Sequence, residues 1–317
     1  MNEKFAYPFP TLMVLGFLFL VACTPKEKEA SQPTANTDLV SYNPETAQVA
    51  NVGPDFNNYW YQGKAEITSY HLEQARYGQI HQGNAILIFV TEEFWADKQV
   101  KYEYGTKTDQ VVPILKLNFM KKFNTGIYPY SLMSSSFVPI EGKAPFKITS
   151  SMQEWCGQAY MQINQRAKGY EGVYHSYFQA ENDAEFKLPQ DVVFEDAIWA
   201  QIRKNPKKLP KGEFQAVPDL MFLRLMHQDS KAYQAKGTST KDGSTTFYTL
   251  EFPTLKRSIK IQFSTKFPHE IEGWEESRQR GTQTLVTKAT RKKTVLSPYW
   301  SLNNVADSVY RKQLDLP

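Results

Sequence analysis

The chain contains 317 residues, of which 41% are hydrophobic and 22% are charged. Its 37 basic and 33 acidic residues give a formal net charge of only +4, so the composition offers no case for a nucleic-acid partner. A chain of this length can bury enough surface to fold without a disulfide or a structural metal, and it has only two cysteines, Cys23 and Cys156.

The first 23 residues are typical of a bacterial lipoprotein signal. Lys4 supplies a positive charge, residues 12–22 form an uncharged, mainly apolar run, and residues 20–23 (Leu-Val-Ala-Cys) match the lipobox pattern. The run is shorter than the about 20 apolar residues that a membrane-spanning helix needs. We therefore predict a signal peptide at residues 1–22 and a mature N-terminus at Cys23, acylated with a chain such as palmitate. A buried N-terminal helix with an incidental cysteine is the alternative.

Residues 23–53 are predicted to form a disordered tether. The segment is rich in small and polar residues and has almost no large apolar side chain, so burial cannot offset the entropy lost on ordering it. A flexible chain of about 30 residues has an r.m.s. span of roughly 30 Å, which would hold a folded domain clear of lipid headgroups. Gly53-Pro54 then marks the start of a β-rich globular domain, residues 54–317.

Alternation of apolar and polar residues dominates this domain. In residues 115–120, 159–164 and 259–264 every second residue is apolar, which predicts strands with one solvated face. Residues 85–90 form a continuous apolar run, which favours a strand covered on both faces.

Turn-forming residues at 124–126 and 241–244 predict hairpins, and therefore antiparallel pairing. Residues 233–293 are predicted to form a meander of four strands that turns near residues 242–243, 253–256 and 281. The predicted fold class is mainly β: an antiparallel, curved sheet or half-barrel with one to three short helices.

Helix signals are few. Asp191 can cap a helix over residues 191–204, and Asn205-Pro206 would end it. A second short helix is predicted at residues 220–227, where a strand is also possible, and a third after Asn303 or Asn304. Prolines and a glycine near 205–217 mark a possible subdivision of the domain.

Cys156 is the first candidate for chemistry. Trp155-Cys156-Gly157 resembles half of a thioredoxin-type motif, but the second cysteine that such redox chemistry needs is absent. A cysteine nucleophile could use His175 or His227 as its base, although no spacing supports this pairing. We interpret Cys156 as a small, packed strand residue and keep an enzyme that uses it as an alternative.

The acidic segment from Glu270 to Glu276 is the second candidate. Its carboxylates and the adjacent His269 could offer ligands to a divalent cation. The next predicted strand is basic, so the two strands could instead pair their charges across a hairpin. We predict ion pairs and no metal site. The residues concerned are Glu270, Glu272, Glu275 and Glu276 on one strand and Lys288, Arg291, Lys292 and Lys293 on the other.

Three segments resemble a family of uncharacterised Gram-negative envelope lipoproteins: residues 118–130 (NFMKKFNTGIYPY), 153–157 (QEWCG) and 273–276 (GWEE). The resemblance would cover nearly all of the mature chain. Some members of the family carry the name septum formation inhibitor Maf, but genuine Maf proteins are nucleotide pyrophosphatases with a Ser-x-Ser-Pro-Arg-Arg loop. That loop is missing here, since the serine-rich residues 132–136 contain neither proline nor arginine. The resemblance therefore implies an envelope lipoprotein and no catalytic residue.

The sequence contains no phosphate-binding loop, nucleophile elbow or His-Glu-x-x-His motif, and it indicates no cofactor. We interpret the chain as a lipoprotein anchored in the outer membrane through acylated Cys23, on the periplasmic or the surface side. It would bind an apolar or amphiphilic ligand, in an aromatic-lined trough that few helices cover, or an envelope protein. The alternatives are a hydrolase or other enzyme that uses Cys156 or the Glu270–Glu276 cluster, and a structural envelope component without a ligand.

Overall fold

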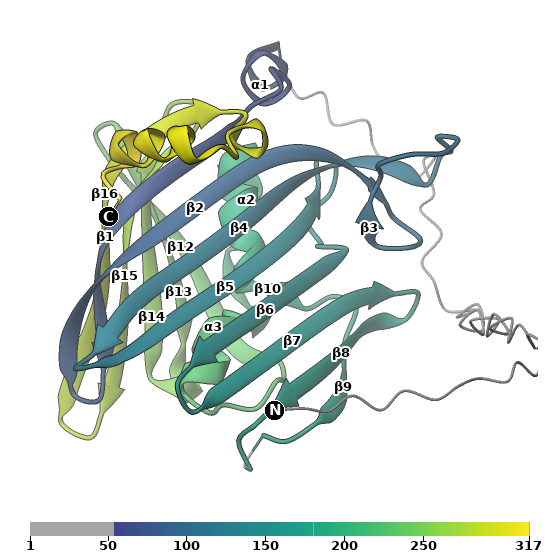
Figure 1. The fold of residues 1–317 in the computed structure, drawn as a ribbon. Helices are drawn as coiled ribbons and strands as arrows, with labels where there is room; N and C mark the ends of the chain where they lie inside the picture. Colours follow the sequence, from purple (N-terminus) through teal and green to yellow (C-terminus); the bar gives the residue numbers. More distant parts are fainter. Residues whose placement is uncertain (1–53, 180, 317) are drawn as a thin grey trace, which may run out of the picture. The chain divides into compact units, whose positions relative to one another are not determined.

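The computed structural model describes residues 54–179 and 181–316, which form one β-rich unit (Figure 1). The predicted signal peptide, Cys23 and the tether lie outside the described residues. A single 16-stranded sheet curls round two short helices, α2 and α3, and does not close on itself. The predicted fold class, a curved and mainly antiparallel sheet with few helices, is therefore confirmed.

The helices are α1 (Pro54–Trp60), α2 (Glu195–Lys204) and α3 (Leu220–Leu225), with 3-10 helices η1 (Pro206–Lys208), η2 (Pro253–Leu255), η3 (Tyr299–Ser301) and η4 (Val305–Leu314). The strands are β1 (Ala65–Arg76), β2 (Gln79–Trp95), β3 (Val100–Lys101), β4 (Val111–Thr125), β5 (Tyr128–Pro139), β6 (Lys147–Glu154), β7 (Gly157–Arg166), β8 (Gly169–Ser176), β9 (Ala184–Leu188), β10 (Val193–Phe194), β11 (Gly212–Val217), β12 (Tyr233–Asp242), β13 (Thr245–Phe252), β14 (Arg257–Ser264), β15 (Ile271–Arg280) and β16 (Gln283–Ser297).

The strand order is β10-β11-β12-β13-β14-β15-β16-β1-β2-β4-β5-β6-β7-β8-β9, with β3 paired to β2. All pairs are antiparallel except β10 with β11. The hairpins predicted at 124–126 and 241–244 are confirmed, but residues 233–297 contain five strands and not the predicted four. The missed connection lies between β14 and β15, where His269 adopts a positive φ of 60° that glycine or asparagine would normally signal.

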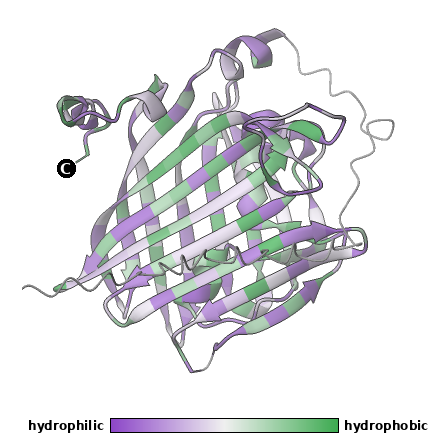
Figure 2. Cartoon of the chain, turned by 45° about the vertical axis from the view of Figure 1, so that its right-hand side comes forward, coloured by the Kyte–Doolittle hydropathy of each residue, from purple (hydrophilic) through white to green (hydrophobic). Residues whose placement is uncertain are grey.

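Alternation along the strands separates an inner face from an outer face (Figure 2). The apolar residues of the alternating segments 115–120, 159–164 and 259–264 are buried, as predicted. In the predicted two-sided strand, Leu87 packs into the main core while Ile88 packs against a small outer cluster that contains Leu314. The C-terminal residues thus cover the outer face of β1, β2 and β16.

Helix α2 lies inside the curve of the sheet, and all ten of its residues are buried. It ends at Lys204, as Asn205-Pro206 predicts, but it begins at Glu195 and not at Asp191. The difference arises because residues 193–194 pair with β11, the next strand after the helix. At the centre of the helix, the Trp199 ring makes edge contacts with the rings of Phe119 and Trp274, each at 5.2 Å between centroids.

Buried charges hold α2 at both ends. At its N-terminus, Glu195 receives two hydrogen bonds from the Arg257 guanidinium of β14, at 2.6 and 2.7 Å. Near its C-terminus, the Arg203 guanidinium donates to both carboxylate oxygens of Glu66 on β1. The Lys204 ammonium donates to the carbonyl oxygens of Pro139 and Gly142, at 2.6 and 2.8 Å. Because these partners belong to distant parts of the sheet, the helix fixes its curvature.

Helices α3 and η4 follow their sequence signals, whereas α1 was not predicted. Asp219 caps α3, since its carboxylate accepts a hydrogen bond from the Phe222 N–H at 2.8 Å. Asn304 and Asp307 form a capping box at the start of η4, so the predicted terminal helix is present as a 3-10 helix. Near the possible subdivision at 205–217, β11 continues the same sheet.

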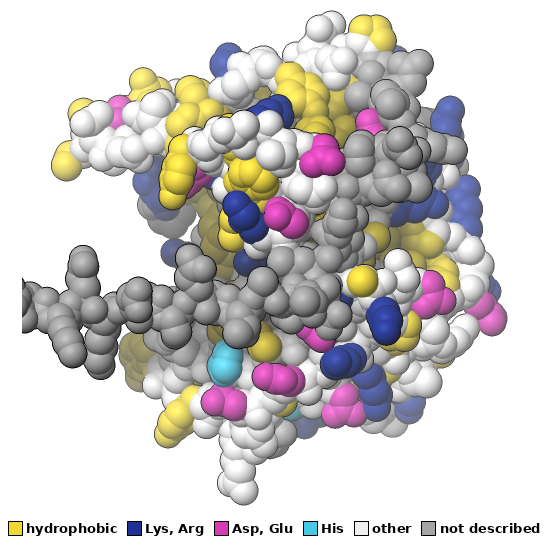
Figure 3. Space-filling model, turned by 90° about the vertical axis from the view of Figure 1, so that its right-hand side faces the viewer, with side chains coloured by type: hydrophobic (Ala, Val, Ile, Leu, Met, Phe, Trp, Pro, Cys, Tyr) yellow, Lys and Arg dark blue, Asp and Glu magenta, His cyan; other side chains and the backbone are white. Residues whose placement is uncertain are grey.

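The surface mixes both signs of charge, as the small net charge implies, and Figure 3 shows basic and acidic side chains interspersed over one face. Within residues 54–179 and 181–316, no helix has the length and apolar character needed to cross a bilayer.

Arg257→Met is expected to lower the free energy of unfolding by about 3–5 kcal/mol, because it leaves the buried carboxylate of Glu195 and the partly buried carboxylate of Glu276 without their cation. The matched control, Lys288→Met, removes an exposed pair with Glu275 and should cost about 0–1 kcal/mol. Urea unfolding followed by circular dichroism measures both values. Similar costs for the two variants would contradict the role assigned to the buried pairs.

A second expectation concerns pH. Burial, helped by the charge of Lys208, lowers the pKa of the Lys204 ammonium to about 7. Unfolded lysine has a pKa of about 10.4, so above pH 7 the unfolded chain binds more protons than the folded chain, and stability rises with pH. Between pH 7.5 and 9.5 the wild-type free energy of unfolding should rise relative to Lys204→Met, by at most about 1.4 kcal/mol per pH unit. Parallel pH profiles of the two proteins would refute this.

Candidate functional site

One end of the sheet, the lower end in Figure 1, collects several hairpin turns. Four hairpins turn there: β1–β2, β4–β5, β6–β7 and β15–β16. The register of the strand pairs between these hairpins places all four turns at the same end of the sheet. Helix α3 finishes close to these turns, where the Arg76 guanidinium donates a hydrogen bond to the Leu225 carbonyl oxygen. We call this end of the sheet the hairpin rim.

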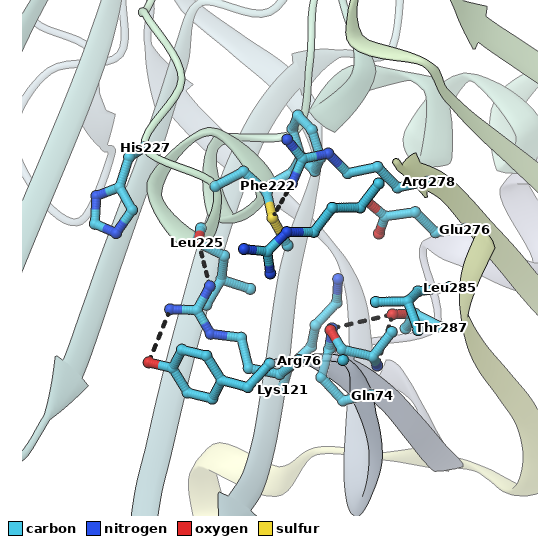
Figure 4. A pocket seen from close by; sticks show the side chains of 15 residues that line it. Gln74, Arg76, Lys121, Phe222, Leu225, His227, Glu276, Arg278, Leu285 and Thr287 are labelled. Atoms are coloured by element: carbon cyan, nitrogen blue, oxygen red, sulfur yellow. Dashed lines mark hydrogen bonds between the residues drawn. The ribbon is translucent and has the colours of Figure 1, made fainter. Parts of the chain in front are cut away.

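A cavity of about 400 Å³ opens at the hairpin rim (Figure 4). Its lining comes from β1, β4, β15 and β16 and from the C-terminal end of α3. The volume is within the range of about 300–1,000 Å³ that is typical of small-molecule sites.

The lining side chains occupy inward-facing positions of their strands. Towards the hairpin rim the inner face becomes more polar: on β1, buried Leu72 is followed in phase by Gln74 and Arg76, and on β4, Lys121 stands between Phe119 and Phe123. Strand β15 repeats the change after Trp274, with Glu276 and then Arg278. The register of the sheet therefore brings these polar groups to one place.

The cavity is cationic. Four basic side chains line it, against the single carboxylate of Glu276. That carboxylate accepts a hydrogen bond from the Arg257 Nε at 2.7 Å, so it is already engaged. Burial alone would raise the pKa of the Glu276 carboxyl, but the charges of Arg257 and Lys121 lower it below its usual value. The basic residues are Arg76, Lys121, Arg278 and Arg280.

Several donors of these cations have no partner among the described residues. The buried Nε atoms of Arg76 and Arg278 make no hydrogen bond. Lys121 is 5% exposed, and within the described part of the chain its ammonium makes no ion pair or hydrogen bond; it lies 4.9 Å from the centre of the Phe119 ring. Burial lowers the pKa of the Arg278 guanidinium, which the Glu276 charge offsets only in part. A bound anion would supply the missing acceptors.

Part of the wall of the cavity is apolar: Phe222, Leu225 and Met226 of the α3 region line it, and so does Leu285 of β16, the register partner of Arg278. The rest of the concave face is filled by α2 and α3, whose residues are buried. The cavity at the hairpin rim is therefore not lined mainly by aromatic side chains, as the trough predicted from the sequence would be. A cavity of the expected size exists, but its lining is mixed.

Cys156 does not occupy the position predicted for it. It is exposed in the turn between β6 and β7, where its backbone N–H donates to the Tyr128 hydroxyl at 2.6 Å. The interpretation as a packed strand residue is wrong, because the strand ends at Glu154. Its two candidate bases are engaged elsewhere: His227 contacts Glu181 at 2.6 Å, and His175 contacts Asp183 at 3.2 Å.

The acidic segment forms ion pairs, as predicted. The Arg291 guanidinium contacts Glu270 and Glu272, both at 2.9 Å, and Lys288 contacts Glu275 at 3.8 Å. Glu276 differs from the prediction, because it faces inward and pairs with Arg257 of β14. Within residues 54–179 and 181–316, no cluster of three or more His, Cys, Asp or Glu residues has metal-binding geometry.

Sequence reasoning missed the lining residues of the cavity. A signal was present, because Arg76 and Lys121 stand in the inward phase of alternating strands, where an apolar residue is the rule. A charge in that phase indicates either a buried ion pair or a site.

The fold defines a half-barrel class of protein, in which one unclosed sheet encloses two helices. Among solved structures, the chain is similar to a "beta-barrel-like protein of domain of unknown function DUF1849" from Brucella abortus. The two share 7% sequence identity over 74% of this chain and 98% of that chain, with a TM-score of 0.46. No protein-family model matches the sequence, and no curated protein is significantly similar to it.

Proposed function

We propose that this chain is a lipid-anchored envelope protein that binds a small amphiphile through an anionic group in the cavity at the hairpin rim. The observation that carries the proposal is the excess of basic side chains in the cavity, where Lys121 is buried without an ion pair and the Nε atoms of Arg76 and Arg278 make no hydrogen bond. Unpaired buried charges are costly, so a ligand that neutralises them gains affinity. The apolar wall favours a ligand with a short hydrocarbon part.

The volume limits the size of this ligand. At about 30 Å³ for each water-sized group, a cavity of about 400 Å³ holds roughly 13 such groups. An anionic headgroup with a chain of several methylenes fits within that number, whereas a complete two-tailed lipid does not.

Two other functions were open from the sequence. The filled concave face favours a purely structural component, and this alternative predicts no ligand at all. The hydrolase has less support, because neither Cys156 nor any serine lines the cavity and Glu270, Glu272 and Glu275 are paired with basic residues.

Octyl phosphate, which has the right size and charge, is expected to bind with one molecule per chain below its micelle concentration. Lys121→Met should weaken binding about tenfold or more, because a hydrogen bond to a charged group contributes about 1.5–3 kcal/mol. Lys122→Met is the matched control, since this neighbour on β4 is exposed on the opposite face. Isothermal titration calorimetry measures the affinities. Equal binding of octyl phosphate and octanol, or equal effects of the two substitutions, would argue against the proposal.

The lipid anchor rests on the lipobox at residues 20–23. Metabolic labelling with a fatty-acid analogue should mark the wild-type chain and leave Cys23→Ala unmarked, because the thiol of Cys23 is the acceptor. Labelling that persists in Cys23→Ala would show that Cys23 is not the acylated residue, and the proposed lipid anchor would then be wrong.

A further inference from the structure

We infer that the hairpin rim docks on the surface of an anionic lipid bilayer, so that the cavity takes up a lipid headgroup while the acyl chains stay in the membrane. The inference rests on the proposed function, since it concerns the same cavity. It adds the source of the ligand and the surface through which the ligand enters.

The first observation is a row of exposed apolar residues on successive turns. Tyr77, Ile127, Trp155 and Tyr177 follow β1, β4, β6 and β8, and they are 64, 85, 63 and 75% exposed. Neighbouring hairpins are two strand spacings apart, about 10 Å, so the row spans about 30 Å along the hairpin rim. Large apolar side chains gathered in this way mark an interaction surface.

The aromatic members of the row are held in place. The Tyr77 ring lies 4.5 Å from the Arg76 guanidinium carbon, and Trp155 lies against the Tyr128 ring at 5.7 Å. The Tyr177 ring lies so close over Gly157 that a Cβ there would meet it at 2.9 Å. Fixed tyrosine and tryptophan side chains, apolar with one polar atom, suit the headgroup level of a bilayer.

The charge of the hairpin rim favours anionic lipids. Lys122, Lys256 and Arg280 are exposed at this end. The exposed carboxylates there, Asp183 and Asp229, lie 3.2 and 2.8 Å from His175 and Lys231. The carboxylates of Glu154 and Glu181 are buried and share the Arg224 guanidinium, at 3.0 and 3.2 Å. Basic residues near a membrane surface gain about 1 kcal/mol each from an anionic leaflet, so this end of the sheet should face it.

The cavity opens on the same surface. Arg76, Tyr77, Gly78 and Arg280 belong both to the lining and to the hairpin turns. Because the cavity holds no more than a headgroup and several methylenes, a bilayer lipid bound there must keep most of its chains outside the protein. Contact between the hairpin rim and the bilayer meets that requirement without removing the lipid from the membrane.

The test uses the thiol of Cys156, which is exposed beside Trp155. Full-length, lipidated protein is labelled there with a fluorophore and reconstituted into vesicles of phosphatidylcholine, with or without phosphatidylglycerol. Lipids that carry a nitroxide on the headgroup serve as quenchers. The control carries the same label at the opposite end of the sheet, in Cys156→Ser/Tyr104→Cys, because Tyr104 is 85% exposed there.

In phosphatidylglycerol vesicles, quenching of the label at Cys156 should be severalfold greater than at position 104, and Tyr77→Ser/Tyr177→Ser should reduce it to the control value. Equal quenching at both positions, or quenching at Cys156 that is the same without phosphatidylglycerol, would overturn bilayer docking. These are also the results expected if a partner protein, and not a bilayer, covers the hairpin rim. Octyl phosphate binding is measured in parallel. Docking can thus fail while that binding persists, which separates this inference from the proposed function.

Discussion

The structure depends on two buried arginine–carboxylate pairs that fasten helix α2 inside the sheet. Arg257 of β14 holds Glu195 at the start of the helix, and Glu66 of β1 holds Arg203 near its end. An apolar helix in an apolar trough has many positions of similar energy, whereas a charge inside the core is tolerated only opposite its partner. The pairs therefore fix where the helix lies, and the unclosed sheet curls to the radius that the helix sets.

This packing of the helices explains why the cavity lies at the hairpin rim. Helices α2 and α3 fill the concave face, so the cavity remains only near the hairpin rim, where the inner face becomes polar. Within the described residues, Lys121 and Arg278 lie there and form no ion pair with a carboxylate, unlike Arg203 and Arg257. In a low-dielectric site such charges interact strongly with an anion, and the same charges in the core would destabilise the fold.

The sequence predicts those parts of the fold that depend on local pattern. The strands around 115–120, 159–164 and 259–264, the hairpin at 124–126 and the end of α2 all follow from alternation, turn residues and proline. The start of α2 does not, because residues 193–194 pair with β11, the strand that follows the helix in the chain. The cavity could not be predicted either: Arg76 and Lys121 each break the local alternation, but only strand order and register show that they lie near each other and near Arg278.

The claim that this cavity holds an anionic ligand is tested most directly by native mass spectrometry of the protein released from its own membranes in mild detergent. We predict that the wild-type chain carries one bound anionic amphiphile. Lys121→Met, released in the same way, should be largely free of it. A wild-type chain that carries no such species, or two proteins that carry the same neutral lipid, would contradict the claim and leave a purely structural role.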